Sequence, residues 1–179
     1  MKEVFRTNKY IFRTFNIENF DDFVQLNEDE SISKYVNHNA NGAAKTFREC
    51  IEKFQEIVDM QEKYGFSYWG VYKPNGTFIG QSGLAQNYDG TFNFCYMFKK
   101  EYWGKGIGTE VNGLVIDYLF THFPIINSIK AMSFIDNIAS VKLLKKLGFM
   151  YINSIEEFGK ELQLFKLTRE NYENNKKII

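Results

Sequence analysis

A glycine-rich segment at residues 102–109 follows an aromatic stretch with strand periodicity and leads directly into an amphipathic stretch with helix periodicity. Its glycines at positions 104, 106 and 108 allow the backbone to approach a ligand closely. The unpaired N–H groups and the positive dipole end of the following helix favour an anion. The segment therefore predicts a strand–turn–helix unit that binds a phosphate group. The same kind of turn also occurs where its role is purely structural.

The composition fits one globular domain. The chain has 179 residues, 44% of them hydrophobic, which is enough for a sizeable core. Its 22 Lys and Arg balance 22 Asp and Glu, so we expect no nucleic-acid partner. Since there is no apolar run of membrane-spanning length and no signal-peptide core at the start, we expect a cytoplasmic protein without a membrane partner. Cys50 and Cys95 lack metal-ligand spacing, which predicts free thiols and no metal site.

The hydrophobic periodicity predicts a single α/β domain over residues 1–179, with a core from about 7 to about 170. Strands are expected at residues 10–15, 68–73, 77–85, 91–98, 125–134, 149–155 and 162–168. Helices are expected to start at Asn19, at Thr46 with a capping box to Glu49, at Ile107 and at Asn137. Residues 171–179 are expected to fray, with docking of Ile178 and Ile179 as the alternative. This order does not match a simple βαβ array, so we expect a central mixed, largely antiparallel sheet of about seven strands with flanking helices.

A second informative segment covers residues 136–149. Asn137 is suited to cap a helix, and Gly148 stands at the position favoured just after a helix end. Together with the glycine-rich segment and the order of the elements, it resembles the GCN5-related N-acetyltransferase (GNAT) superfamily over nearly the whole chain. The superfamily's cofactor signature is Gln or Arg, two residues, Gly, one residue, then Gly or Ala, and Trp103, Gly106 and Gly108 stand at these positions. Trp103 departs from it and is similar to the form of the RimJ/RimL branch, the ribosomal-protein acetyltransferases.

The resemblance implies acetyl-CoA as the acetyl donor and a GNAT fold. It implies that the strand before the glycine turn splays from its neighbour, and that Met97 or Phe98 offers the N–H that stabilises the oxyanion. The cofactor-binding residues implied are Met97, Phe98, Lys99, Trp103, Gly104, Lys105, Gly106, Ile107, Gly108, Thr109, Asn137 and Ser140.

The acid that protonates the departing CoA thiolate is assigned by the same resemblance. Many members carry a tyrosine seven residues after the asparagine, but this chain has Leu144 there. Ser140 stands where the RimJ/RimL-like branch has a serine that is proposed to hydrogen-bond the CoA sulfur, so the acid role is assigned to Ser140. A serine at this place in a capped helix also serves helix geometry alone.

A general base is not evident. Related enzymes often have a glutamate in the strand before the glycine turn, and the matching position here is Asn93. Of the two histidines, His122 stands at a helix end, which favours a capping role, and His38 lies in a polar loop. An α-amine acceptor, with a reference pKa of about 8, reduces the need for a base.

The function we expect is acetyl transfer from acetyl-CoA to a primary amine, by direct attack in a ternary complex. The acceptor is a protein N-terminal α-amine or a small-molecule amine. One alternative is an aminoglycoside or polyamine acetyltransferase, which would have acidic side chains facing its cleft. The acidic residues that keep it open are Asp21, Asp22, Glu28, Asp29 and Glu30. Another alternative is a non-catalytic acyl-CoA sensor, because Asn93 and Leu144 replace expected catalytic groups.

Two further points stay open from the sequence. Five aromatic residues either line the acceptor pocket or belong to the core. They are Tyr35, Tyr64, Phe66, Tyr68 and Trp69. Free strand edges are compatible with a homodimer, but nothing in the sequence determines the oligomeric state.

Overall fold

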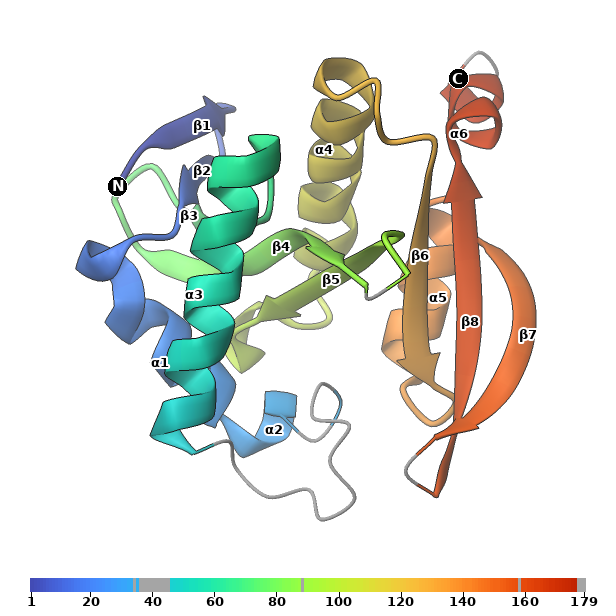
Figure 1. Cartoon of the computed structure of the whole chain (residues 1–179), viewed down its shortest axis with the longest axis horizontal. Helices are drawn as coiled ribbons and strands as arrows, with labels where there is room; N and C mark the ends of the chain where they lie inside the picture. Colours follow the sequence, from blue (N-terminus) through green and yellow to red (C-terminus); the bar gives the residue numbers. More distant parts are fainter. Residues whose placement is uncertain (34, 36–45, 88, 158, 177–179) are drawn as a thin grey trace.

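The chain forms one sheet flanked by helices in a computed structural model that describes residues 1–33, 35, 46–87, 89–157 and 159–176 (Figure 1). The strands are β1 Glu3–Arg6, β2 Ile11–Thr14, β3 Tyr68–Tyr72, β4 Phe78–Gln86, β5 Phe92–Phe98, β6 Ser128–Phe134, β7 Met150–Glu157 and β8 Lys160–Thr168. The helices are α1 Phe20–Glu28, α2 Glu30–Ser33, α3 Phe47–Tyr64, α4 Ile107–His122, α5 Ile138–Lys146 and α6 Arg169–Lys176, with short 3-10 turns η1 Ile17–Asn19 and η2 Lys100–Tyr102.

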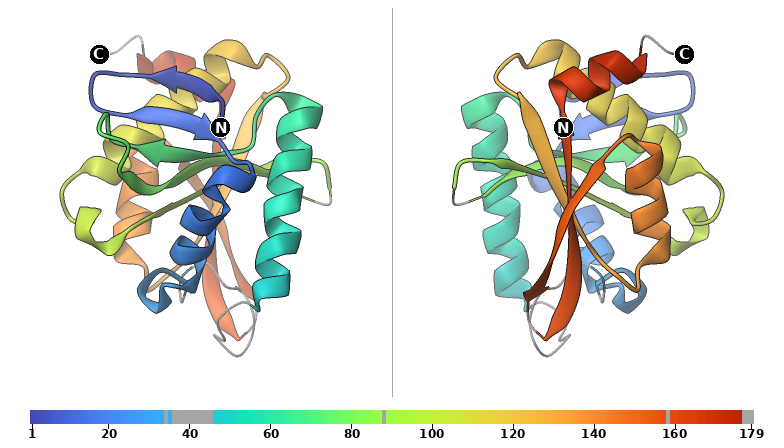
Figure 2. Two further views of the ribbon diagram at one scale, coloured as in Figure 1. Left: turned by 90° about the vertical axis from the view of Figure 1, so that its left-hand side faces the viewer. Right: turned by 90° about the vertical axis from the view of Figure 1, so that its right-hand side faces the viewer.

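The sheet confirms the expected fold class. Within the described residues it has eight strands in the order β1-β2-β3-β4-β5-β6-β8-β7, one more than expected. β5 and β6 pair in parallel, and the other neighbours pair antiparallel. α1 and α3 pack on one face of the sheet, and α4 packs on the other, with α5 beside it (Figure 2). The sheet therefore separates two cores, one on each face.

The long helix α3 follows the sequence prediction closely. The Thr46 side chain accepts from the N–H of Glu49, and the Glu49 side chain accepts from the N–H of Thr46, so the capping box is confirmed. The buried side of α3 carries Cys50, Phe54, Ile57 and Met60, at the spacing of an amphipathic helix. No helix in the described part of the chain has the length and apolarity that crossing a membrane requires.

The N-terminal strand β1 was not expected. Phe5 stacks on Phe12 and on Tyr118, with ring centroids 4.0 and 4.3 Å away. A strand of four residues is too short to show a period in the sequence, so its place depends on these contacts with β2 and α4.

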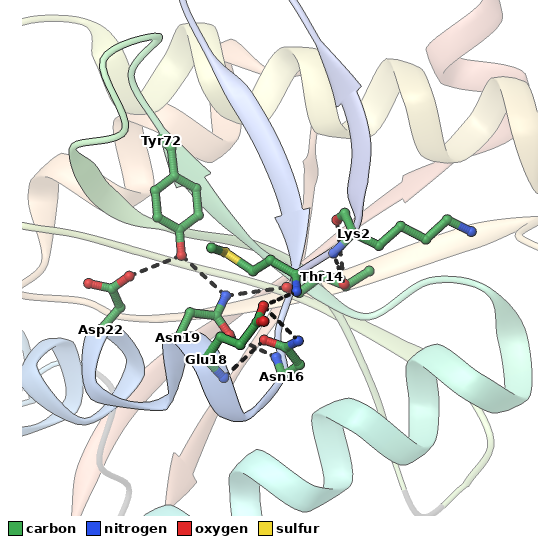
Figure 3. Close-up of polar contacts among 8 residues, drawn as sticks. Lys2, Thr14, Asn16, Glu18, Asn19, Asp22 and Tyr72 are labelled. Atoms are coloured by element: carbon green, nitrogen blue, oxygen red, sulfur yellow. Dashed lines mark hydrogen bonds and ion pairs between the residues drawn. The ribbon is translucent and has the colours of Figure 1, made fainter.

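The start of α1 also differs from the prediction, because Asn19 does not cap it through its side chain. The Asn19 amide instead donates to the Thr14 carbonyl and to the Tyr72 hydroxyl, both at 3.2 Å (Figure 3). Tyr72 in turn donates to Asp22 at 3.0 Å. Asn16 serves as the cap of η1. This network fastens α1 to β2 and β3. The competing tertiary partner explains why Asn19, although it stands at the N-cap position of α1, makes no side-chain capping hydrogen bond.

The C-terminal segment forms α6, so the expectation that residues 171–179 fray is wrong for the described part, which ends at residue 176. Tyr172 stacks on Phe120 with centroids 5.0 Å apart, and Tyr172 and Lys176 both hydrogen-bond to Asp117. Arg169 donates to carbonyl groups at the end of α4 and just after it. The sequence of α6 is too polar to show that α4 holds it in place.

Candidate active site

A gap in the sheet lies between β5 and β6. The two strands pair only near their starts, Phe92 with Ile129 and Asn93 with Lys130, and then diverge (Figure 1). A cavity of about 1270 Å³ opens there, and residues 94–98 of β5 and residues 131–134 of β6 line it. The sheet is therefore split at its centre, where a ligand can reach the edge of β5.

The backbone of β5 points alternately towards β4 and into this gap. At the end of the strand the Lys99 N–H donates to the Ile79 carbonyl at 3.0 Å. Because hydrogen-bonding directions alternate along an antiparallel strand, Met97 turns its N–H towards β4, whereas Tyr96 and Phe98 turn theirs into the gap. The indole N–H of Trp103 donates to the Phe98 carbonyl at 2.7 Å. This bond ties the glycine-rich turn to the edge of the gap.

At two positions of the turn the backbone adopts a conformation that favours glycine. Gly104 and Gly106 have φ values of 70° and 76°, in the left-handed region that glycine adopts readily. A Cβ atom at either position would meet nothing within 4 Å. The space beside the turn is therefore open, and both residues line the cavity.

Helix α4 begins just after Gly106. Gly106 is the N-cap residue and has no side chain that could cap the helix. The first helical hydrogen bond runs from the Glu110 N–H to the Gly106 carbonyl at 3.1 Å, so the N–H groups of residues 107–109 precede the helical ladder. Gly108 has a different role. A Cβ atom there would lie 3.2 Å from Leu143 Cδ1, so this glycine lets α4 pack closely on α5.

The start of α5 brings a hydroxyl pair to the cavity. Asn137 Oδ1 accepts from the Ser140 N–H at 3.2 Å, which confirms Asn137 as a helix cap. The Ser140 hydroxyl lies 2.8 Å from the hydroxyl of Tyr96. Burial raises the pKa of Tyr96 to about 12, so its phenol keeps its proton at neutral pH. Leu144 also lines the cavity, but it is 1% exposed and its side chain has no proton to donate.

Tyr96 is a site residue that the sequence analysis did not single out. It belongs to the aromatic row of β5 with Phe92, Phe94 and Phe98, which packs towards α4 and α5. The one available signal was its hydroxyl, the only polar atom that this row of side chains carries. A phenol among phenyl rings needs a partner when it is buried, and Ser140 is that partner.

Most of the expected cofactor-binding residues line the cavity. These are Met97, Phe98, Trp103, Gly104, Gly106, Gly108, Thr109, Asn137 and Ser140. Lys99, Lys105 and Ile107 are not among the described residues that line it. The Lys99 ammonium lies 5.4 Å from the centre of the Phe78 ring, Ile107 packs on the core, and Lys105 is exposed.

The cavity continues to the other face of the sheet, beside α3. Four charged side chains of α3 line it there: Lys53, Glu56, Asp59 and Lys63. Of the aromatic residues left open above, Tyr35, Tyr64 and Tyr68 line the cavity, whereas Phe66 and Trp69 are fully buried in the core.

Unpaired polar atoms also face this part of the cavity. Gln81 is 1% exposed, and its Oε1 has no hydrogen-bond partner among the described residues. The same is true of Ser67 Oγ and Asn93 Oδ1. A buried acceptor atom without a donor is costly, so these atoms suit a ligand that supplies N–H or O–H groups. The Asn93 amide donates to Cys95 Sγ at 3.3 Å.

A family model described as an acetyltransferase (GNAT) domain matches residues 9–150 of this chain. The chain belongs to the GNAT acetyltransferase family. It is similar to the uncharacterized N-acetyltransferase p20 of Bacillus licheniformis, at 25% identity over 95% of this chain and 98% of that protein. As a GNAT family member it is an N-acetyltransferase, and acetyl-CoA is the donor of its family.

Two solved structures illustrate the GNAT fold. A spermidine N-acetyltransferase from Vibrio cholerae, in complex with CoA and spermine, has a TM-score of 0.76 at 17% identity, and the match covers 94% of this chain and 100% of that one. The alpha-N-protein acetyltransferase RimL, in complex with coenzyme A, has a TM-score of 0.75 at 11% identity, covering 93% and 98%. Both likenesses concern the fold.

The sequence left two histidines as candidates for a general base. His122 lies at the end of α4, where its Nδ1 is 3.0 Å from the Tyr118 carbonyl, and it does not line the cavity in the described part of the chain. His38 lies outside the described residues. No group of three metal-ligating side chains is found among the residues with described positions.

The acidic cluster around α1 does not face the cavity. None of Asp21, Asp22, Glu28, Asp29 and Glu30 is among the described residues that line it. Asp22 instead accepts from Tyr72 (Figure 3), and Asp29 accepts from the hydroxyl and the N–H of Ser31 at 2.5 and 2.9 Å. These two carboxylates serve the local structure of the first helices.

Proposed function

We propose that this enzyme transfers the acetyl group of acetyl-CoA directly to a primary amine. The acceptor is either the α-amine of a peptide or a small molecule with a single amino group. The observation that carries the proposal is that the β5–β6 gap, the glycine-rich turn and the capped start of α5 meet at one cavity. Acetyl-CoA supplies a thioester whose carbonyl carbon the amine attacks.

The cofactor end of the cavity has a group for each part of this donor. The N–H groups of residues 107–109 and the dipole of α4 suit the pyrophosphate, and Gly104 and Gly106 leave open space beside them. The Phe98 N–H points into the gap and suits the developing oxyanion better than that of Met97, which is directed to β4. Ser140 suits the sulfur. Trp103 takes the place of Gln or Arg in the signature by holding the turn to Phe98.

The acceptor end favours a single amine over a polyamine or an aminoglycoside. Glu56 and Asp59 are balanced there by Lys53 and Lys63, and the acidic cluster of α1 lies elsewhere. An acceptor with several cations would need an excess of carboxylates. An α-amine has a reference pKa of about 8, so an uncharged fraction is available near neutral pH without a dedicated base. We also assign the chain to the RimJ/RimL-like branch within this proposal, and the serine at position 140, in the first turn of α5, supports the assignment.

The test is calorimetry with acetyl-CoA, followed in the same sample by thiol release with three amine panels: N-terminal peptides, polyamines and aminoglycosides. We expect binding, and turnover with the peptides or with simple monoamines. Turnover confined to polyamines or aminoglycosides would contradict the acceptor assignment. Binding without turnover in any panel would favour the acyl-CoA sensor, and absence of binding would overturn the proposal.

A further inference from the structure

We infer that Tyr96 is a positioning residue for Ser140: its phenol donates a hydrogen bond to Ser140 Oγ and thereby directs the Ser140 proton towards the CoA sulfur. The inference rests on the proposed function, because that function brings the sulfur to the start of α5. It explains why a polar atom stands in the aromatic row of β5, and it gives the enzyme a second residue for the departing thiolate.

The position of the Ser140 hydroxyl is determined from two sides. Its backbone N–H is held by Asn137 Oδ1 at 3.2 Å, which places the residue in the first turn of α5. Serine hydroxyls in helices commonly bond to a carbonyl of the preceding turn. Here the hydroxyl meets Tyr96 at 2.8 Å, so it points out of the helix towards β5 and the cavity.

The direction of this hydrogen bond follows from the chemistry of the two hydroxyls. A serine hydroxyl has one proton and two lone pairs. The Tyr96 phenol is protonated at neutral pH, since burial raises its pKa to about 12. A phenol is a stronger donor than an alcohol, so Tyr96 donates and Ser140 accepts. The Ser140 proton is then available to an acceptor in the cavity.

The Tyr96 ring is held independently of its hydroxyl. Its centroid lies 5.8 Å from that of Phe94 and 6.3 Å from that of Phe98. It also stands opposite Ser82 in the register of β4 and β5. Replacing Tyr96 with phenylalanine therefore removes the hydrogen bond and leaves the ring packed.

In the reaction, the amine nitrogen bonds to the acetyl carbon, and the carbon–sulfur bond breaks with its electron pair remaining on sulfur. The nitrogen loses one proton to solvent. Ser140 donates its hydrogen bond to the sulfur as negative charge develops there, and hydrogen bonds to charged groups are the stronger ones. Tyr96 keeps Ser140 in the orientation that does so.

The first test compares the binding of CoA with that of desulfo-CoA by calorimetry at pH 7 and pH 9. The ratio of the two dissociation constants isolates the sulfur, because every other titrating group affects both ligands. In the wild type we expect the affinity for CoA, relative to that for desulfo-CoA, to rise about tenfold from pH 7 to pH 9, because the thiol ionises beside Ser140. In Tyr96→Phe and in Ser140→Ala we expect most of this gain to disappear.

Tyr151→Phe is the matched control. The Tyr151 hydroxyl lies 3.1 Å from the Ser154 hydroxyl on the edge strand β7, which is the same kind of pair outside the described cavity lining. This variant should keep the full pH-dependent gain. A Tyr96→Phe variant that also keeps it would overturn the inference while leaving the proposed function standing. A wild-type chain that binds neither ligand would overturn both.

Kinetics give a second readout. Tyr96→Phe should lower kcat about tenfold with little change in the KM for acetyl-CoA, because the interaction is made with the leaving group. The double variant Tyr96→Phe/Ser140→Ala should be no slower than Ser140→Ala alone, since Tyr96 acts through Ser140. Additive losses in the double variant would contradict the inference.

Discussion

The two ends of the cavity are built from different parts of the chain. The end beside α4 and α5 is made mainly of backbone: two glycines with positive φ, the first turn of a helix and the open edge of β5. The end beside α3 is made of side chains, with four charged residues and the Gln81 oxygen, which has no hydrogen-bond partner in the described part of the chain. In the proposed function, acetyl-CoA binding therefore depends on chain conformation, whereas the choice of acceptor depends on which side chains line the cavity.

The largest effect should come from breaking the backbone end. Gly106→Val puts a β-branched residue at φ 76° and adds atoms in the open space beside the turn. We expect the Kd for acetyl-CoA to rise about a hundredfold, equivalent to about two lost charge-assisted hydrogen bonds. Calorimetry measures it. Gly76→Val is the control, because Gly76 has a φ of 86° and equally open surroundings in the β3–β4 turn.

Both glycine variants should lose similar stability, about 1–2 kcal/mol, since a side chain in the left-handed region is strained. The affinity for acetyl-CoA should fall only in the Gly106 variant. Equal affinities in the two variants would show that the glycine-rich turn is structural and that the donor end of the cavity lies elsewhere.

A second prediction concerns the stability of the fold and involves neither end of the cavity. Arg169 donates to the carbonyls of Phe120, Phe123 and Ile126 at 2.5, 3.0 and 2.9 Å. Arg169→Ala should lower the free energy of unfolding by about 2 kcal/mol, because these groups lose a charged donor. Urea denaturation measures it, and the acetyl-CoA Kd should not change.

The control for this change is Arg48→Ala. Arg48 forms an exposed pair with Glu52 at 3.1 Å on α3, and such pairs contribute less than about 0.5 kcal/mol. If Arg169→Ala were no more destabilising than Arg48→Ala, α6 would not be docked as described.

The third prediction addresses the side-chain end. Gln81→Leu removes a buried oxygen that has no partner in the described structure. We expect the KM for the amine to rise about fivefold, which corresponds to the loss of one neutral hydrogen bond to the amine. The acetyl-CoA Kd should stay unchanged. Steady-state kinetics measure it. Gln163→Leu is the control, because Gln163 Oε1 is also buried and unpaired among the described residues but lies outside the lining.

The smallest effect concerns the end of the gap where β5 and β6 still pair. Hydrogen bonds from Thr91, and then from Lys130, lower the pKa of Asp89 to about 2. A carboxyl with a lowered pKa stabilises the fold above its unfolded pKa, and this contribution is lost as the pH falls from about 4 to about 2. Asp89→Asn should therefore reduce the pH dependence of unfolding in this window. An unchanged dependence would mean that this carboxylate does not stabilise the β5–β6 junction.

Much of the fold was predictable because local patterns and tertiary contacts agree. The capping box of α3, the Asn137 cap and the antiparallel strands all follow from residue spacing. The errors occur where tertiary contacts dominate. β1 is placed by Phe5 stacking on other elements, α6 is held by Asp117, and the Asn19 side chain bonds to Tyr72 instead of capping α1.

The candidate site divides in the same way. Positions with a left-handed backbone are recognisable in the sequence as glycines, so the turn at residues 104–106 and the helix start after it could be predicted from residue spacing alone. Tyr96 and Ser140 are 44 positions apart and Gln81 lies on another strand, so tertiary packing determines which hydroxyls and amides face the cavity. Backbone conformation is encoded locally, whereas contacts between distant side chains arise only when the sheet and its helices pack together.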